Sequence, residues 1–128
     1  MTGAGDAEYV FSVRIDLSPA DPELRLEPTT VETTLFKTAA DPGETGWLFF
    51  RDNLWRGEVN DPDHLRGSAE EALDLDVRSI EFRELRTDEA YLAALQDAIA
   101  DNLELFEAGD TAEVVKKYLG SRVHVREG

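Results

Sequence analysis

The sequence predicts an α+β domain in which helices pack on one face of a mainly antiparallel sheet of about five strands. Segments with alternating apolar side chains are typical of strands, and segments with apolar side chains at helical spacing are typical of amphipathic helices. The two kinds follow one another in the order βββαβααβ, which favours this fold class. Because the 128 residues contain no internal repeat or linker, we expect a single domain over residues 1–128, with residues 1–7 flexible.

Three strands are predicted in the first half of the chain. In residues 9–17 apolar side chains occupy every second position, which is typical of a strand with one buried face. Three prolines then predict a loop, and the β-branched residues of 30–39 predict a second strand. Residues 47–56, WLFFRDNLWR, begin with consecutive apolar residues after the turn DPGETG, so we expect a third, central strand there.

The second half alternates helices and strands. A helix begins either at Asp61 and Pro62, a cap and a first-turn residue, or at the capping box of Ser68 and Glu71. Residues 77–86 alternate again and predict a fourth strand. After this strand we expect a long helix over residues 88–106 and then a shorter helix, which Asp110 caps and Gly120 ends. The chain closes with a strand over residues 121–127.

Charge is the strongest signal in the composition. The chain has 28 acidic and 13 basic residues, a net charge of -15, and the acids are interspersed among the periodic segments. Repulsion of this size opposes folding in dilute buffer and is screened at about 1 M salt, where the screening length is ~3 Å. The composition therefore predicts a protein of a salt-accumulating cytoplasm; the alternative is an acidic or partly disordered protein of an ordinary cell.

Several classes of function are disfavoured by the composition. The absence of cysteine excludes disulfides and thiolate metal sites. No apolar run approaches the ~20 residues that cross a bilayer, and the first ten residues lack the pattern of a signal peptide, which predicts a cytoplasmic protein without membrane contact. Nucleic acid is an improbable partner, because its binding requires a basic footprint.

The predicted strands collect the positive charge. Nine of the thirteen basic residues fall within or at the ends of predicted strands: Arg14, Lys37, Arg51, Arg56, Arg78, Arg83, Arg86, Arg122 and Arg126. Since neighbours on a strand point to opposite faces, an outer sheet face is expected, provided that no bulge shifts the register. It would carry Arg14, Glu32, Glu81, Arg83, Arg122, His124 and Arg126.

This face has two interpretations. Cross-strand ion pairs, each worth under ~1 kcal/mol, would give it a structural role. Alternatively, guanidinium groups beside Trp47 or Trp55 would bind a protein partner, a second copy of the chain or a small anion. The candidate ligand or partner residues are Trp55, Arg56, Arg14, Arg83, Arg122 and His124, with no metal and no cofactor.

Trp55 and Arg56 also have a structural interpretation. With Leu54 turned inward, the Trp55 indole would lie over the sheet edge, and Arg56 would pair with Glu58 or Asp61 before a turn at Gly57.

Two further groups of residues have the side chains of a metal site or of an acid–base site. The cluster EVNDPDH gathers Glu58, Asn60, Asp61, Asp63 and His64, but it departs from the calcium-loop pattern, and helix capping accounts for it. An acid–base site of His124 with Glu81 and Arg83 would instead make the protein a small hydrolase or transferase.

Three motifs carry a family resemblance. DNLWRGEVND, SIEFRELRTDE and KKYLGS resemble segments of the haloarchaeal LWR-salt proteins, named after the triplet found here as Leu54, Trp55 and Arg56. The likeness extends from the first predicted strand to the last. It implies a halophilic archaeal source and brings no established activity, cofactor or catalytic residue. The expectation is therefore a non-enzymatic binding or interaction module that uses the outer sheet face and the strand end at Trp55.

Overall fold

The structure is a computed structural model and describes residues 6–126 of the chain. Its elements confirm the α+β class. In chain order they are β1 (Ala7–Asp16), β2 (Thr30–Thr38), α1 (Phe49–Asn53), β3 (Leu54–Trp55), β4 (Glu58–Val59), α2 (Pro62–Leu73), β5 (Val77–Thr87), α3 (Glu89–Ala100), the 3-10 helix η1 (Leu103–Leu105), α4 (Thr111–Leu119) and β6 (Val123–Val125). Of the segment expected to be flexible, Asp6 and Ala7 are described and Ala7 already belongs to β1, whereas residues 1–5 lie outside the described residues.

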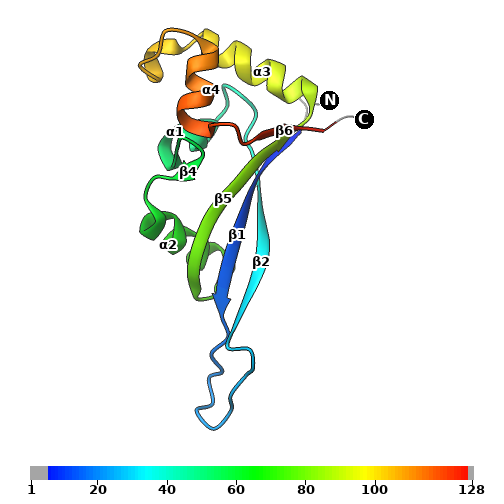
Figure 1. The fold of residues 1–128 in the computed structure, drawn as a ribbon, viewed down its shortest axis with the longest axis vertical. Coiled ribbons are helices and arrows are strands. Elements are labelled where there is room, and N and C mark those ends of the chain that lie inside the picture. Colours follow the sequence, from blue (N-terminus) through cyan, green and yellow to red (C-terminus); the bar gives the residue numbers. More distant parts are fainter. Residues whose placement is uncertain (1–5, 127–128) are drawn as a thin grey trace.

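The main sheet has four strands in the order β2-β1-β5-β6. The pairs β2-β1 and β1-β5 are antiparallel, and β6 runs parallel to β5. The predicted number and order of strands need correction, because β3 and β4 form a separate two-stranded hairpin. The strands β1, β2 and β5 form a long arm that ends in the β1–β2 loop, and α1, α3 and α4 gather at the opposite end (Figure 1).

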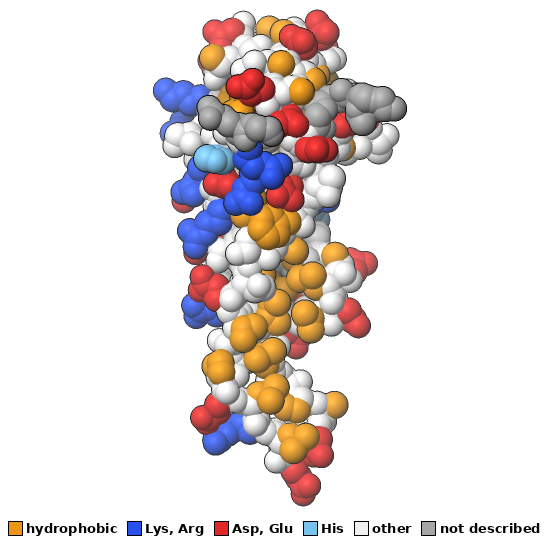
Figure 2. Space-filling view, turned by 90° about the vertical axis from the view of Figure 1, so that its right-hand side faces the viewer, with side chains coloured by type: hydrophobic (Ala, Val, Ile, Leu, Met, Phe, Trp, Pro, Cys, Tyr) orange, Lys and Arg blue, Asp and Glu red, His pale blue; other side chains and the backbone are white. Residues whose placement is uncertain are grey.

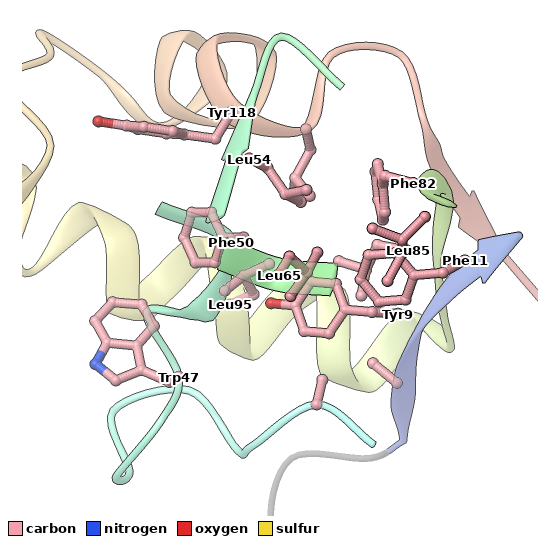
Figure 3. Packing of buried hydrophobic residues seen from close by; sticks show 14 of the residues in the cluster. Tyr9, Phe11, Trp47, Phe50, Leu54, Leu65, Phe82, Leu85, Leu95 and Tyr118 are labelled. Carbon is pink, nitrogen blue, oxygen red and sulfur yellow. The ribbon is translucent and has the colours of Figure 1, made fainter. Parts of the chain in front are cut away.

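One hydrophobic cluster joins the sheet to the helices. Apolar side chains on alternate positions of β1, from Tyr9 to Ile15, pack with Ile80, Phe82 and Leu85 of β5 and with buried side chains of all four α-helices. Figure 3 shows Phe50 of α1 near Trp47 and Leu95, with Tyr9 and Phe11 of β1 beyond. Because one face of β1 and of β5 packs against the core, apolar residues alternate with polar ones in the sequences of these strands.

The third strand predicted over residues 47–56 is wrong. A short helix, α1, occupies residues 49–53, and only Leu54 and Trp55 are extended. Trp47, Phe50 and Leu54 are buried, and their spacing of three and four is that of a helix face. A short apolar run fits a buried strand or a buried helical turn equally well, and here tertiary packing selected the helix.

The helix predicted over residues 88–106 is shorter than expected. Asp88 caps α3 by accepting a hydrogen bond from the Tyr91 amide at 2.7 Å, but the helix ends at Ala100. The Asn102 side chain donates to the Ala98 carbonyl at 2.8 Å, and the chain continues as η1. Such side-chain bonds to the backbone compete with helix continuation.

The other helix boundaries follow the predicted caps. Asp61 caps α2 through the His64 amide at 3.1 Å and Pro62 is its first residue, so the alternative start at Ser68 is not used. Asp110 caps α4 through the Glu113 amide at 2.8 Å, and Gly120 ends it.

Two bulges modify the predicted sheet register. The pairing of β1 with β5 shifts between Val10 and Phe11 and again between Arg14 and Ile15. At the first shift Val10 faces Glu84 while Phe11 faces Phe82, so Arg83 is the extra residue. Beyond it Leu85 turns inward, and Glu84 and Arg86 share the outer face with Val10.

Candidate binding site at the Trp55 turn

Three arginines of the outer sheet face are engaged in ion pairs. Arg14 lies 3.3 Å from Glu32, and Arg83 lies 3.6 Å from Glu81. Arg86, which the outer-face prediction did not include, lies 3.0 Å from Glu84. These pairs are the geometry expected for the structural interpretation of this face.

The remaining outer-face candidates lie around β6. The Arg122 guanidinium donates to the Phe82 and Arg83 carbonyls at 3.5 and 3.4 Å, next to the edge of β5 that β6 leaves free. His124 faces Arg86 on β5, and the Arg126 amide donates to the Thr87 carbonyl at 2.7 Å.

His124 does not meet Glu81. Since Glu81 is five positions from Arg86 along β5, it lies roughly 15 Å from the His124 backbone. The geometry therefore gives no support to an acid–base site of His124 with Glu81 and Arg83.

The turn between β3 and β4 is built from two residues with positive φ. Leu54 is buried as expected, Trp55 faces Glu58 across the hairpin, and Arg56 and Gly57 form the loop with φ of 53° and 81°. Positive φ at both central positions matches the twist of a two-residue hairpin, and glycine suits the second position because it lacks a Cβ.

This turn docks onto the end of α4. The Arg56 amide donates to the Lys117 carbonyl at 2.7 Å, and the Gly57 amide donates to the Tyr118 carbonyl at 3.0 Å. These carbonyls belong to the last turn of the helix, which has no intrahelical donors for them. Gly120 makes the approach feasible, because a Cβ there would lie 3.1 Å from the Arg56 carbonyl carbon and oxygen.

A cleft of ≈ 910 Å³ opens where the turn meets α4. Its lining comes from the turn, from the segment after η1 and from α4 with its C-terminal extension: Trp55, Arg56, Glu107, Glu113, Lys116, Lys117, Gly120 and Ser121. Trp55 is 44% exposed and packs edge-on against Tyr118, with ring centres 5.9 Å apart. Tyr118 in turn contacts the buried rings of Phe50 and Phe106, so the Trp55 indole packs against the hydrophobic core through Tyr118.

Two cations lie near the Trp55 ring. The Arg56 guanidinium carbon is 5.6 Å and the Lys117 ammonium nitrogen 5.8 Å from the ring centre. Within residues 6–126, Arg56, Lys116 and Lys117 form no ion pair, and the expected pairing of Arg56 with Glu58 or Asp61 is wrong. Lys117 donates to the Phe106 carbonyl at 3.0 Å, which leaves its other two donors free for a ligand.

Backbone strain concentrates at the same cleft. Arg56 with φ of 53° and Glu107 with φ of 51° are two of the three non-glycine residues with positive φ among the described residues. Asp74 and Glu107 both occupy the left-handed position that commonly follows a helix, after α2 and after η1, whereas Arg56 lies in the hairpin loop. For a long side chain this conformation costs about 1–2 kcal/mol, and such strain is typical of functional sites.

Prediction from the sequence found two of the eight residues that line this site. Trp55 and Arg56 were candidates, whereas Glu107, Glu113, Lys116 and Lys117 were missed. The available signal was the pair of lysines in the last turn of α4, in a chain with only three lysines. Cations near a helix C-terminus also interact favourably with the helix dipole, so the sequence alone favours a stabilising role for these two lysines.

Among residues 6–126 the structure has no group of three or more metal-ligating side chains, and no helix there is long and apolar enough to span a membrane. Burial raises the pKa of Tyr9 and raises that of Tyr91 to about 12, so both phenols remain protonated at neutral pH. Tyr91 uses its hydroxyl to donate to the Ala40 carbonyl at 2.7 Å.

Comparison with known proteins identifies the family. The chain matches no curated protein and no solved structure. A family model described as LWR-salt protein matches residues 5–128, which includes the turn and the cleft, and the chain belongs to the LWR-salt family.

Proposed function

We propose that this protein is a non-enzymatic binding module of a salt-rich cytoplasm, and that its ligand site is the cleft at the Trp55 turn. One observation carries the proposal. Arg56, Lys116 and Lys117 line a cleft beside the exposed Trp55 indole and form no ion pair with any described residue, in a chain whose net charge is -15. Arg56 is moreover held in a left-handed conformation, which glycine or asparagine would adopt at lower cost.

The chemistry of the cleft favours an acidic segment of a partner protein. Guanidinium and ammonium groups form charge-assisted hydrogen bonds with carboxylates, and tryptophan and arginine are among the residue types enriched at the energetic centres of protein interfaces. Three cations against Glu107 and Glu113 leave the lining with a net charge of +1. Glu113 also accepts a hydrogen bond from the Gly109 amide at 2.6 Å, so its carboxylate is oriented toward the backbone.

The outer sheet face is the weaker candidate surface. A ligand carboxylate there would have to displace Glu32 from Arg14 or Glu81 from Arg83. Nucleic acid stays disfavoured, since counterion release requires a larger basic footprint than this cleft offers.

The proposal is tested by titration with defined peptides. A short oligoglutamate and an oligoglutamine of equal length are added in separate titrations, and the two tryptophan indole N–H signals are followed by NMR. Trp55 is exposed and Trp47 is buried at 8% exposure, so Trp47 is an internal reference. We expect the Trp55 signal to shift with oligoglutamate only, and Lys116→Gln with Lys117→Gln to weaken the affinity by about tenfold, or 1.4 kcal/mol.

Two results would count against the site. One is an unmoved Trp55 signal at saturating peptide; the other is a set of shifts confined to the amides of β5 around Arg83. A shift produced equally by free glutamate would instead indicate that the cleft takes small anions without recognising a peptide.

Adaptation to salt is tested separately. Circular dichroism in dilute buffer is expected to show loss of structure that returns at about 1 M KCl, because screening removes repulsion among carboxylates. A melting temperature that does not change across this range would refute the adaptation and leave the cleft proposal standing.

A further inference from the structure

Strand β2 forms an uncovered edge of the sheet. It contains nine residues, Thr30–Thr38, and pairs with β1 on one side only among the residues that the structure describes. Val31 is 37% and Phe36 49% exposed. Figure 2 looks onto this edge and shows hydrophobic side chains in a stripe along the arm, with basic side chains to one side of it.

The backbone pattern shows which groups are free. Ala39 donates to the Ala7 carbonyl at 3.0 Å and Leu17 donates to the Thr29 carbonyl at 2.7 Å, so odd-numbered residues of this strand face β1. Because hydrogen-bonding groups alternate along a strand, the even-numbered residues direct their N–H and C=O groups away from β1. These are Thr30, Glu32, Thr34, Phe36 and Thr38.

The edge has little of the usual protection against pairing. Soluble proteins protect exposed edges with proline, bulges, charged side chains or very short strands. The pairing of β2 with β1 is free of register shifts, and the strand contains no proline. Its charges are Glu32 and Lys37, which cancel, in a chain that is otherwise strongly acidic.

We propose that β2 pairs antiparallel with β2 of a second copy of this chain, about a two-fold axis at Thr34, to join two four-stranded sheets into one of eight strands. In this register all five free residues find partners, since Thr34 faces Thr34, Glu32 faces Phe36 and Thr30 faces Thr38. About ten hydrogen bonds result from these pairs. Registers shifted by two residues in either direction leave part of the edge unpaired.

Charge and shape favour a second copy over an unrelated strand. Directly opposed side chains in this register include no pair of like charges, because Lys37 faces Val31 and Glu32 faces Phe36. In this register the aliphatic stem of Lys37 packs on the exposed Val31, and the stem of Glu32 lies against the exposed Phe36. An association through this edge leaves the Trp55 cleft open, so the two proposals stand or fall independently.

The chain contains no cysteine, which permits a direct test of the register. Thr34→Cys is expected to form a disulfide-linked dimer rapidly under mild oxidation, because the two copies of this position face each other across the axis. Thr38→Cys is the matched control: it also lies on the free edge, but its two copies are about 27 Å apart in the proposed register. Equal cross-linking of both variants, or faster cross-linking of Thr38→Cys, overturns the proposal.

Sedimentation analysis of the unmodified chain measures the association itself. We expect a dimer at about 2 M KCl that dissociates at lower salt, because two copies with a net charge of -15 repel each other. Thr34→Pro removes an N–H that β1 does not use and should weaken the dimer at least about tenfold. Thr34→Val keeps the amide and should dimerise like the parent. Should Thr34→Pro lose its circular dichroism, Thr34→Lys serves instead, since it places two ammonium groups on the axis. A monomer at every salt concentration overturns the proposal.

Discussion

The outer face of the sheet and the cleft at the Trp55 turn both carry basic side chains, but three arginines of the face are paired with carboxylates, whereas the cations of the cleft form no ion pair with any described residue. On the face, Arg14, Arg83 and Arg86 each have a carboxylate partner on the same or a neighbouring strand. In the cleft, Arg56 and Lys117 lie near an indole ring and form no ion pair within the described residues. An arginine that is already paired with a carboxylate of the protein gains little further electrostatic free energy from a carboxylate of a ligand.

The difference arises from how each surface is built. The strands of the arm place residues at fixed cross-strand distances, so an arginine on β1 meets the glutamate that faces it on β2. The cleft is assembled from segments distant in sequence, which meet only because the turn amides bind the last carbonyls of α4. A count of basic residues along the chain does not separate these two situations.

The largest expected effect comes from removing the floor of the cleft. Phe106 is fully buried and stacks on Phe50 with ring centres 5.7 Å apart. We expect Phe106→Ala to lower the free energy of unfolding by about 3–5 kcal/mol, measured by urea denaturation at about 2 M KCl. Val10→Ala, which truncates a buried side chain on the outer face, should cost only about 1.5 kcal/mol. If Phe106→Ala lowered the free energy of unfolding by less than Val10→Ala does, the residues that line the cleft would not depend on packing against the core.

An intermediate effect is expected where the turn meets α4. Gly120→Ala places a Cβ 3.1 Å from the Arg56 backbone at a position with φ of 63°. The loss should be about 1–2 kcal/mol and should be accompanied by weaker peptide binding, because the turn must move away from the helix. Gly109→Ala is the matched control, since the nearest contact of its Cβ is the Glu113 carboxylate at 3.8 Å. Equal losses from both variants would contradict a specific role for the docked turn.

The smallest effect is expected on the outer face. Arg14 and Glu32 have side-chain exposures of 54% and 57%. A double-mutant cycle with Arg14→Gln and Glu32→Gln should give a coupling energy under ~1 kcal/mol at low salt and less at high salt. Coupling well above that value would mean that the pair is more than a solvated contact.

Sequence periodicity predicted those parts of the fold in which one face is buried. The strands β1 and β5 and the amphipathic helix α4 follow their apolar patterns, and Asp61 and Asp110 cap the helices as expected. Residues 47–56 were misassigned because consecutive apolar residues fit a strand or a helical turn, and the choice depends on packing against Phe106 and Tyr118.

The candidate site was predictable only in part. Trp55 and Arg56 were predicted because these residue types are common in interfaces. No feature of the neighbouring sequence indicates that the Lys117 ammonium nitrogen lies 5.8 Å from the centre of the Trp55 ring. The bulge at Arg83 likewise depends on pairing with β1, so the parity of side chains beyond it could not be read from β5 alone.

The central claim is that the unpaired cations of the turn, and not the paired arginines of the sheet, bind the ligand. Its most direct test compares the affinity of Arg56→Asn and Arg83→Asn for the same oligoglutamate, with unfolding followed in parallel. We predict that Arg56→Asn weakens binding by about tenfold or more while its stability stays equal or rises by up to about 1 kcal/mol, because asparagine tolerates the left-handed conformation. Arg83→Asn should bind within about twofold of the parent. Unchanged affinity for Arg56→Asn together with a loss for Arg83→Asn would contradict the claim and assign binding to the outer face of the sheet.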